Sequence, residues 1–278
     1  MASDKKQKKT VNTAWIFDVD GVITNLVTKK ITEPQILDFI VNKLEIGESI
    51  AFNSGRGLEW MIENVINLLL LKIKNKNVLG NFFAVGEKGG TWLTINRNEE
   101  IKKNMDPSLQ IPLSLLEKIR AFGIKYSNRM IEYEKTKKTM FAFEMKTGLN
   151  PKEFKKLQAI VVPEIEKIIK KNQLSDKLIV DPTRIGTDIQ YRQVGKGFAT
   201  KRILNWLRDK GITAEKVITF GDSKSDFEMA EETQSEGVPT IFVYVGGDGA
   251  FDNIQTDISI FNTKNKFEQG TLEYLKSL

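Results

Sequence analysis

The stretch Trp15-Ile16-Phe17-Asp18-Val19-Asp20-Gly21 decides the fold of this 278-residue chain. The four residues before Asp18 are apolar, which is typical of a buried strand, and Gly21 allows the backbone to turn. Asp18 and Asp20 are two positions apart, so both carboxylates can share one face of the strand end. Buried carboxylates are costly unless they bind a cation or take part in a reaction. The alternative is that both acids simply begin a turn.

The composition limits the chemistry that such a site can perform. The chain has no His and no Cys, which excludes a Ser-His-Asp triad, a Cys nucleophile and zinc sites built from His or Cys. Carboxylates, lysines and hydroxyls remain, and oxygen-rich sites select hard cations such as Mg²⁺. The absence of Cys also excludes a disulfide framework and is compatible with the cytoplasm, where we expect the protein to act.

The distribution of charged and apolar residues argues against membrane and nucleic-acid partners. The net charge is +6, and half of this excess lies in the first ten residues. We expect residues 1–12 to be a disordered basic tail. No run of ~18 apolar residues, the length of a membrane span, occurs, and the N-terminal residues contain no signal-like apolar region. We therefore expect neither a nucleic acid nor a membrane as a partner. We expect the protein to be a monomer or a homodimer.

Strand and helix patterns alternate at both ends of the chain. Strand patterns lie at 14–17, 48–52, 82–85 and 91–95, with helix patterns at 32–44 and 58–74. The alternation returns with helix patterns at 197–210, 227–232 and 270–278 and strand patterns at 216–220, 240–245 and 258–260. This order predicts an α/β fold, with a Rossmann-like parallel sheet formed by residues 13–95 and 194–278.

Residues 96–193 interrupt this core with a different order of elements. Helix, strand, strand, helix, strand and strand patterns follow one another at 112–122, 130–136, 139–146, 150–171, 178–180 and 187–192. Two hairpin-sized strand pairs predict an inserted α+β (αββαββ) domain, with its helices on one face of an antiparallel sheet. Asn150 is expected to cap the second helix, and Pro163 to kink or interrupt it.

Four polar stretches lie where open α/β sheets bind ligands, at the carboxyl ends of core strands or at helix starts. They are Asp18/Asp20, Ser54-Gly55, Lys196-Gly197 and Asp222/Asp226. Together they supply the carboxylates, hydroxyl and lysine that phosphoryl transfer with Mg²⁺ requires. Simpler alternatives are that Ser54 and the Asp222/Asp226 pair are helix caps, and that Lys196 is a solvated lysine, although its charge opposes the helix dipole.

The motifs FDVDGVIT, FNSGR, VGKGFA and GDSKSD resemble, in order, the four signature motifs of the haloacid dehalogenase (HAD) superfamily. The insert resembles the type IIB, or Cof-type, cap of that superfamily. Over residues 14–261 the chain is similar to sugar-phosphate phosphatases, sucrose-phosphate phosphatases and phosphomannomutases. Val22 stands where the family often has Thr, and Ser225 where Cof-type members often have Asn. Neither departure removes an expected ligand or nucleophile.

The resemblance implies a role for each acid of the motifs. Asp18 is the implied nucleophile, which forms an aspartyl-phosphate. Asp20 is the implied acid–base residue, which protonates the leaving alcohol and then activates water. Mg²⁺ would be held by Asp18, the backbone carbonyl of Asp20 and Asp222, with Asp226 as a direct or water-mediated ligand.

The resemblance also implies how the substrate is held. Ser54 and the Gly55 amide at a helix start would bind the phosphoryl group, and Lys196 would balance its charge. Candidate contacts to the leaving group come from the last turn and strand of the cap: Arg184, Thr187, Asp188 and Gln190. Asp188 and Gln190 share a strand face. Such groups suit a polyhydroxylated substrate, although an exposed strand edge explains them equally well.

The sequence thus predicts a Mg²⁺-dependent HAD-type phosphomonoesterase that hydrolyses a phosphorylated sugar or a similar small metabolite. A phosphomannomutase-like sugar phosphomutase, which returns the phosphoryl group to the sugar, is the alternative. A third possibility is a binding protein with a basic tail on an inactive domain. The intact Asp18, Asp20, Lys196 and Asp222 argue against that third reading.

Overall fold

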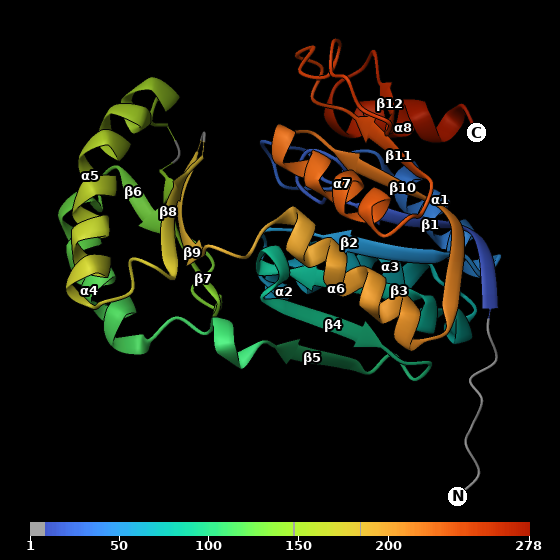
Figure 1. Ribbon diagram of the computed structural model, residues 1–278, viewed down its shortest axis with the longest axis horizontal. Helices are drawn as coiled ribbons and strands as arrows, with labels where there is room; N and C mark the ends of the chain where they lie inside the picture. Colours follow the sequence, from blue (N-terminus) through green and yellow to red (C-terminus); the bar gives the residue numbers. More distant parts are fainter. Residues whose placement is uncertain (1–8, 147, 184) are drawn as a thin grey trace, which may run out of the picture. The chain divides into compact units, whose positions relative to one another are not determined.

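The computed structural model describes residues 9–146, 148–183 and 185–278, which fall into two compact units (Figure 1). The first unit comprises the described residues up to Asn104 together with Gly195–Leu278, and the second comprises Met105–Val194. The sequence pattern predicted that the inserted unit begins after residue 95. The structure moves this boundary because strand β5 (Ile101–Met105) extends the sheet of the first unit.

Eight strands form the sheet of the first unit. Besides β5 they are β1 (Lys9–Phe17), β2 (Ser49–Asn53), β3 (Phe82–Gly86), β4 (Thr91–Ile95), β10 (Ile212–Gly221), β11 (Thr240–Tyr244) and β12 (Ser259–Asn262). Their order is β12-β11-β10-β1-β2-β3-β4-β5. The strands from β12 to β3 are parallel, and β4 is antiparallel to β3. The expected parallel α/β core is confirmed.

The first strand is longer than the sequence pattern suggests. β1 begins at Lys9, and its register with β10 pairs Lys9 with Ile212. Residues 9–12 therefore belong to the sheet and not to a disordered tail, because their backbone groups are taken up by the ladder to β10. The rest of the expected tail, residues 1–8, lies outside the described residues.

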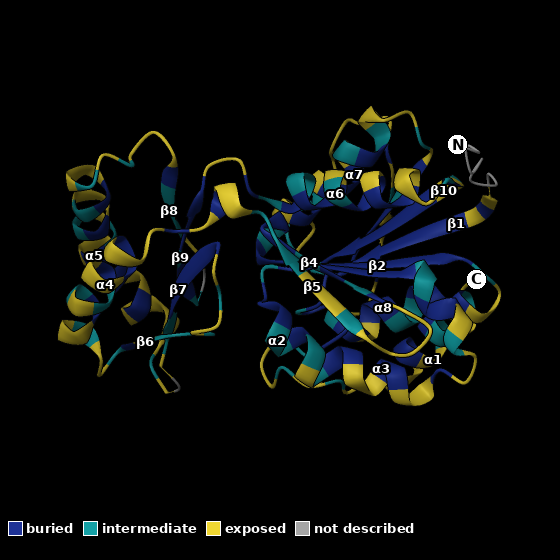
Figure 2. Cartoon of the chain, turned by 90° about the horizontal axis from the view of Figure 1, so that it is seen from below, coloured by how far each residue is buried: buried dark blue, intermediate teal, exposed yellow. Residues whose placement is uncertain are grey.

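Helices cover both faces of this sheet (Figure 2). α6 (Lys196–Asp209) and α7 (Phe227–Ser235) lie on one face, and α1 (Pro34–Glu45), α2 (Leu58–Met61), α3 (Asn67–Lys72) and α8 (Phe267–Lys276) on the other. A π-helical segment, η1 (Ile62–Ile66), joins α2 to α3 where one regular helix was expected. Short 3₁₀ helices are η2 (Lys76–Asn81), η3 (Glu87–Gly89), η4 (Pro107–Leu109), η5 (Ile124–Tyr126) and η6 (Lys224–Asp226). In the described part of the chain, no helix is long and apolar enough to cross a lipid bilayer.

Aromatic packing joins β1 to β10 at the centre of the sheet. Phe17 and Phe220 stack with ring centroids 4.5 Å apart, and Trp15 lies beside both rings. All three side chains are buried. Aromatic pairs of this kind contribute roughly 1 kcal/mol beyond the area that they bury. They therefore fix the two strands against each other just where both of them end.

The second unit is a four-stranded antiparallel sheet with two helices on one face (Figure 1). Its elements are α4 (Leu113–Gly123), β6 (Met130–Glu132), β7 (Met140–Met145), α5 (Pro151–Lys171), β8 (Leu178–Pro182) and β9 (Gly186–Tyr191). The strand order is β6-β7-β9-β8, and each neighbouring pair is antiparallel. The order of elements along the chain is the one that the sequence pattern predicts.

Helix α5 differs from its expected form. It continues through Pro163 without ending, from Pro151 to Lys171. Asn150 caps its start, since its side-chain oxygen accepts a hydrogen bond of 2.8 Å from the Lys152 amide. The buried face consists of Phe154, Leu157, Gln158, Val161, Ile165 and Ile169. Burial of this face offsets the interior proline, which costs about 3 kcal/mol in a helix.

Candidate active site

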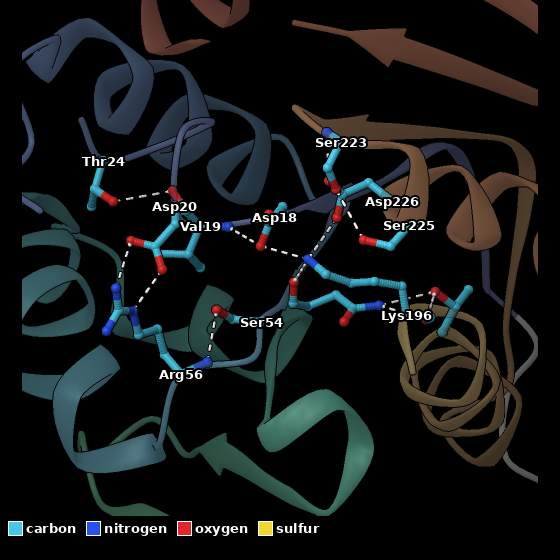
Figure 3. A network of polar contacts seen from close by, with 12 residues as sticks. Asp18, Val19, Asp20, Thr24, Ser54, Arg56, Lys196, Ser223, Ser225 and Asp226 are labelled. Carbon is cyan, nitrogen blue, oxygen red and sulfur yellow. Dashed lines mark hydrogen bonds and ion pairs between the residues drawn. The ribbon is translucent and has the colours of Figure 1, made fainter. Parts of the chain in front are cut away.

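The carboxyl ends of β1, β2 and β10 lie side by side and bring the predicted motifs together. Phe17 of β1 pairs with Phe52 of β2 and with Phe220 of β10, so the three strands end at the same level. The ladder continues one step further, because the Asp18 amide donates to the Phe220 carbonyl at 3.0 Å. Figure 3 shows the polar side chains that follow these strands as one group, together with Lys196 from α6.

Lys196, the first residue of α6, is the centre of a buried ion-pair network. Its Nζ lies 2.6 Å from Asp18 Oδ1 and 2.8 Å from Asp226 Oδ1, and it donates to the Asn53 carbonyl at 2.9 Å. The ammonium therefore lies among three oxygens, of which Asp226 Oδ1 contacts it as an ion pair and has no hydrogen-bond partner among the described residues. Although burial alone lowers the pKa of a lysine, the attraction of Asp18 and Asp226 raises the pKa of Lys196. The reading of Lys196 as a solvated lysine is therefore wrong.

Asp226 is held in place by its own turn. Its Oδ2 accepts hydrogen bonds from the Ser223 hydroxyl at 2.6 Å and from the Ser223 amide at 3.0 Å. Ser223, and not Asp222, is the N-cap residue of η6. A Cβ on Gly221 would lie 2.0 Å from the Asp226 Cβ, so only glycine allows β10 to pass this side chain. Asp226 thus presents a fixed Oδ1 to Lys196.

Three carboxylates at the strand ends form a candidate metal site. Asp18, Asp222 and Asp226 each offer an oxygen within 4.8 Å of the other two. Burial, reinforced by repulsion from Asp226 and Asp222, raises the pKa of Asp18 well above its usual range in spite of Lys196. Burial and repulsion from Asp226 likewise raise the pKa of Asp222 to about 7. A divalent cation would relieve this repulsion, and the all-oxygen donor set fits Mg²⁺.

Gly21 brings the turn after β1 against this cluster. Its φ is +75°, a left-handed conformation that favours glycine. A Cβ built on Gly21 would lie 2.6 Å from Asp222 Oδ2. The glycine predicted to turn the chain therefore also makes room for a carboxylate of the candidate metal site.

The Asp20 carboxylate is engaged separately, by two cations. Arg56 donates from Nε to Oδ2 at 2.6 Å and from its terminal Nη2 to Oδ1 at 3.3 Å, and Lys29 Nζ lies 3.3 Å from Oδ1. Burial raises the pKa of Asp20, but the attraction of Arg56 and Lys29 outweighs it, and the net pKa is lowered. The sequence reading did not assign either cation. Arg56 directly follows the Ser-Gly pair, which could have signalled it, whereas no pattern distinguishes Lys29 from the other lysines.

The Ser54-Gly55 pair lies in a turn between β2 and α2. Ser54 is buried, and its hydroxyl accepts a hydrogen bond of 3.2 Å from the Arg56 amide. Its carbonyl accepts from the Lys88 amide at 3.0 Å. Because α2 begins only at Leu58, the Gly55 amide belongs to the turn and not to the helix start that the sequence suggested. Ser54 is likewise not the cap of this helix.

The cap candidates lie on different faces of the sheet in the second unit. Thr187 is fully buried and accepts a hydrogen bond of 3.3 Å from Gln158 of α5. Contrary to its expected role at the substrate, Thr187 therefore faces the helices. Side chains alternate along a strand, so Asp188 and Gln190 lie on the opposite face. Gln190 is buried, and its Oε1 has no hydrogen-bond partner in the part of the chain that the structure describes. Arg184 lies outside the described residues.

Comparisons with solved structures show the same fold at low sequence identity. The C-terminal domain of C. albicans trehalose-6-phosphate phosphatase is 16% identical with a TM-score of 0.66, over 96% of this chain and 92% of that chain. A trehalose-6-phosphate phosphatase related protein is 16% identical with a TM-score of 0.60, over 95% and 96%. Plasmodium falciparum IMP-nucleotidase is 14% identical with a TM-score of 0.57, over 96% and 61%.

Sequence comparison identifies the family. A search of curated proteins finds no significant match. The family model described as haloacid dehalogenase-like hydrolase matches residues 15–236, a range that contains all the acids around Lys196. On this match, and with the fold and the four motifs described above, the chain belongs to the haloacid dehalogenase-like hydrolases.

Proposed function

We propose that this protein is a Mg²⁺-dependent phosphatase that hydrolyses a phosphorylated sugar or a similar small metabolite through an aspartyl-phosphate at Asp18. The observation that carries the proposal is the buried Lys196 ammonium between Asp18 and Asp226, beside the three-carboxylate cluster. Membership of a hydrolase family supports it. So do structural neighbours whose names identify them as a phosphatase and a nucleotidase.

The charges of the site support a divalent cation and an anionic substrate. The carboxylates of Asp18, Asp20, Asp222 and Asp226 are paired or clustered with three cations, Lys29, Arg56 and Lys196. These seven groups carry a net formal charge of −1. A bound Mg²⁺ would reverse the sign to +1, and a positively charged pocket attracts a phosphate dianion. When bound, Mg²⁺ would supply Lewis-acid stabilisation of the phosphoryl oxygens through Asp18, Asp222 and Asp226.

Asp18 is oriented for attack on phosphorus. Its Oδ1 accepts hydrogen bonds from Lys196 and from the Val19 amide at 2.7 Å, so Oδ2 is the oxygen that we expect to attack. The bond from Asp18 to phosphorus forms as the bond from phosphorus to the leaving oxygen breaks, and Asp20 gives that oxygen a proton. Asp20 then takes a proton from water, which attacks phosphorus and releases phosphate and free Asp18.

The two cations on Asp20 explain how its proton affinity can follow the substrate. In the free protein Arg56 and Lys29 keep Asp20 ionised. A phosphate dianion that enters beside them competes for both cations and adds negative charge, and each effect raises the pKa of Asp20. Asp20 would therefore gain the proton that the leaving group needs only when substrate is bound.

The leaving group that we propose is polar and small. Asp188 and Gln190 share the face of the second unit's sheet that is opposite to α5, and hydrogen-bonding groups there suit a sugar. Trehalose 6-phosphate is the first substrate to test, since a phosphatase of that ester is a structural neighbour, and IMP is the second. We expect the reaction to occur in the cytoplasm, in a monomer or homodimer without nucleic acid.

The test is phosphate release from a panel of trehalose 6-phosphate, hexose phosphates and IMP, with Mg²⁺ and with EDTA. Asp18→Asn should lower kcat on the order of 10³-fold or more, because it removes the nucleophile. Asp176→Asn, at an exposed acid of the second unit, is the matched control and should leave kcat unchanged. An unchanged kcat in Asp18→Asn would contradict the proposal. An isomerised sugar phosphate without free phosphate would identify the phosphomutase alternative instead.

A further inference from the structure

Asn53, the last residue of β2, is a buried amide to which the sequence motifs assign no role. Its side chain is fully buried, directly before Ser54. Its Oδ1 has no hydrogen-bond partner among the described residues. A buried polar atom without a partner costs about 1–3 kcal/mol, so an apolar residue here would serve stability at least as well. We therefore infer that the Asn53 amide has a role other than stabilising the fold.

Asn53 forms hydrogen bonds with both the side-chain ammonium and the main-chain carbonyl of Lys196. Its main-chain carbonyl accepts from Lys196 Nζ at 2.9 Å, and its side-chain Nδ2 donates to the main-chain carbonyl of Lys196 at 2.9 Å. Nδ2 also donates to the Thr200 hydroxyl at 3.1 Å, which in turn donates to the same Lys196 carbonyl at 2.9 Å. Asn53 and Lys196 are 143 positions apart in the chain. The pair thus joins the end of β2 to the first turn of α6.

The first turn of α6 depends on such outside contacts. Its N-cap residue, Gly195, has no side chain to cap the helix. The amides of Gly195 and Gly197 donate instead to the Lys88 carbonyl and to Glu228, at 3.1 Å each. A lysine has four rotatable side-chain bonds, so its ammonium is placed only if its backbone end is placed as well. Asn53 is the contact that fixes the Lys196 carbonyl from the β2 side.

We propose that Asn53 is a positioning residue for Lys196: it fixes the first turn of α6 so that the ammonium stays between Asp18 and Asp226. This inference rests on the proposed function for its effect on turnover. Positioning errors of about 1 Å in an active site cost up to about 10²-fold in rate. Loss of the Asn53 amide should therefore lower kcat with little change in KM, because Lys196 acts on the group in transfer.

The experiment compares Asn53→Val, close in size and suited to a strand, with wild type in the phosphate-release assay. We expect kcat to fall on the order of 10- to 100-fold. The free energy of unfolding should change by no more than about 1 kcal/mol, since the Thr200 hydroxyl and the Lys196 carbonyl still bond each other. Thr233→Val is the matched control, because Thr233 is also buried and bonds the carbonyl four residues back in its helix, α7. Asn53→Ala replaces Asn53→Val if the latter does not fold.

A double-mutant cycle separates positioning from a structural role. If Asn53 acts through Lys196, Asn53→Val should have no further effect on kcat in a Lys196→Met background. A readout independent of activity is the NMR signal of the buried Lys196 ammonium, identified by its loss in Lys196→Met. It should shift or broaden in Asn53→Val and stay unchanged in Thr233→Val.

Three outcomes overturn the inference. They are wild-type kcat in a folded Asn53→Val, an equal loss of kcat in both Lys196 backgrounds, and an unchanged ammonium signal. If wild type releases phosphate from no ester, the proposed function fails instead. The ammonium signal then still decides whether Asn53 holds Lys196.

Discussion

Asp222 differs from the other two acids of the candidate metal site in its contacts with cations. Asp18 and Asp226 share Lys196, whereas Asp222 has no ion-pair partner among the described residues. Its pKa is accordingly about 7, raised by burial and by Asp226. The ionised form of Asp222 therefore destabilises the metal-free protein. A metal ion requires this ionised form as its ligand.

The first prediction concerns the stability of the metal-free protein against pH. Between pH ~4 and ~7 the folded state keeps a proton on Asp222 that the unfolded chain has released, so the free energy of unfolding falls as pH rises through this window. One such proton gives a slope of up to about 1.4 kcal/mol per pH unit. Urea unfolding in EDTA should show a steeper fall in wild type than in Asp222→Asn. Parallel curves for the two proteins would contradict the assignment.

The second prediction concerns Gly21, whose missing side chain makes room for Asp222. Gly21→Ala and Gly237→Ala place a Cβ on residues with nearly the same φ, +75° and +78°. Both should lose about 1–2 kcal/mol of stability from the left-handed backbone. Only Gly21→Ala also displaces the Asp222 carboxylate, since nothing lies within 4 Å of a Cβ on Gly237.

Calorimetric titration with Mg²⁺ separates the two effects of Gly21→Ala. Affinity should fall at least about tenfold in Gly21→Ala and stay near wild type in Gly237→Ala, because a displaced ligand weakens the site while remote strain does not. Equal affinities in the two variants would show that the Gly21 contact with Asp222 is irrelevant to the metal.

At the scale of elements, α5 carries a proline in its interior. Pro163 is exposed, and it removes one helical hydrogen bond from the middle of a 21-residue helix. Pro151, in contrast, occupies the first turn, where a missing N–H costs nothing. The two prolines of one helix therefore offer a matched comparison of position.

The third prediction is that Pro163→Ala stabilises the second unit and Pro151→Ala does not. Regaining the bond is worth up to about 3 kcal/mol, and greater freedom of the unfolded chain offsets about 1 kcal/mol. A net gain of about 1–2 kcal/mol should appear in denaturant unfolding followed through the second unit. A loss of stability in Pro163→Ala would mean that the ring itself packs usefully on the surface of α5.

Local signals explain which elements could be predicted from the sequence. Asp18 directly follows a hydrophobic run, and Ser54 and Asp222 each follow one after a single intervening residue. A strand end is marked by this change from apolar to polar residues. Strand β5 was missed because its residues, IKKNM, hold only two apolar side chains and remain partly exposed at the sheet edge. Such an edge strand is specified by its neighbour and not by its own pattern.

Side-chain direction explains which site residues could not be predicted. Thr187 and Asp188 both carry hydrogen-bonding groups, and only the register of β9 decides that Thr187 faces α5. Asn53 contacts Lys196 across 143 positions of the chain, and Lys29 contacts Asp20 from a nearby loop that lies outside the motifs. No local pattern encodes either contact. The motifs thus predict which residues gather at the site, and the tertiary structure alone shows how they are held.

At the scale of the whole molecule, every described acid of the candidate metal site belongs to the first unit. The second unit has its own sheet and its own helix-covered core. A ligand that binds only the folded state stabilises the part that binds it, by about 2.7 kcal/mol at a hundredfold excess over Kd. Metal binding should therefore stabilise the first unit and leave the stability of the second unit unchanged.

The fourth prediction is that Mg²⁺ slows amide hydrogen exchange in β1 and β10 but not in β7 and β9. Asp18 directly follows β1 and Asp222 directly follows β10, so opening of the first pair breaks the candidate metal site. Opening of the second pair leaves that site intact. Mass spectrometry of exchange with Mg²⁺ and with EDTA measures both pairs in one experiment. Asp222→Asn should abolish the gain in β1 and β10, and Asp176→Asn should retain it. An equal gain in β7 and β9 would mean that the two units unfold as one cooperative body, and a gain that survives Asp222→Asn would place the metal elsewhere.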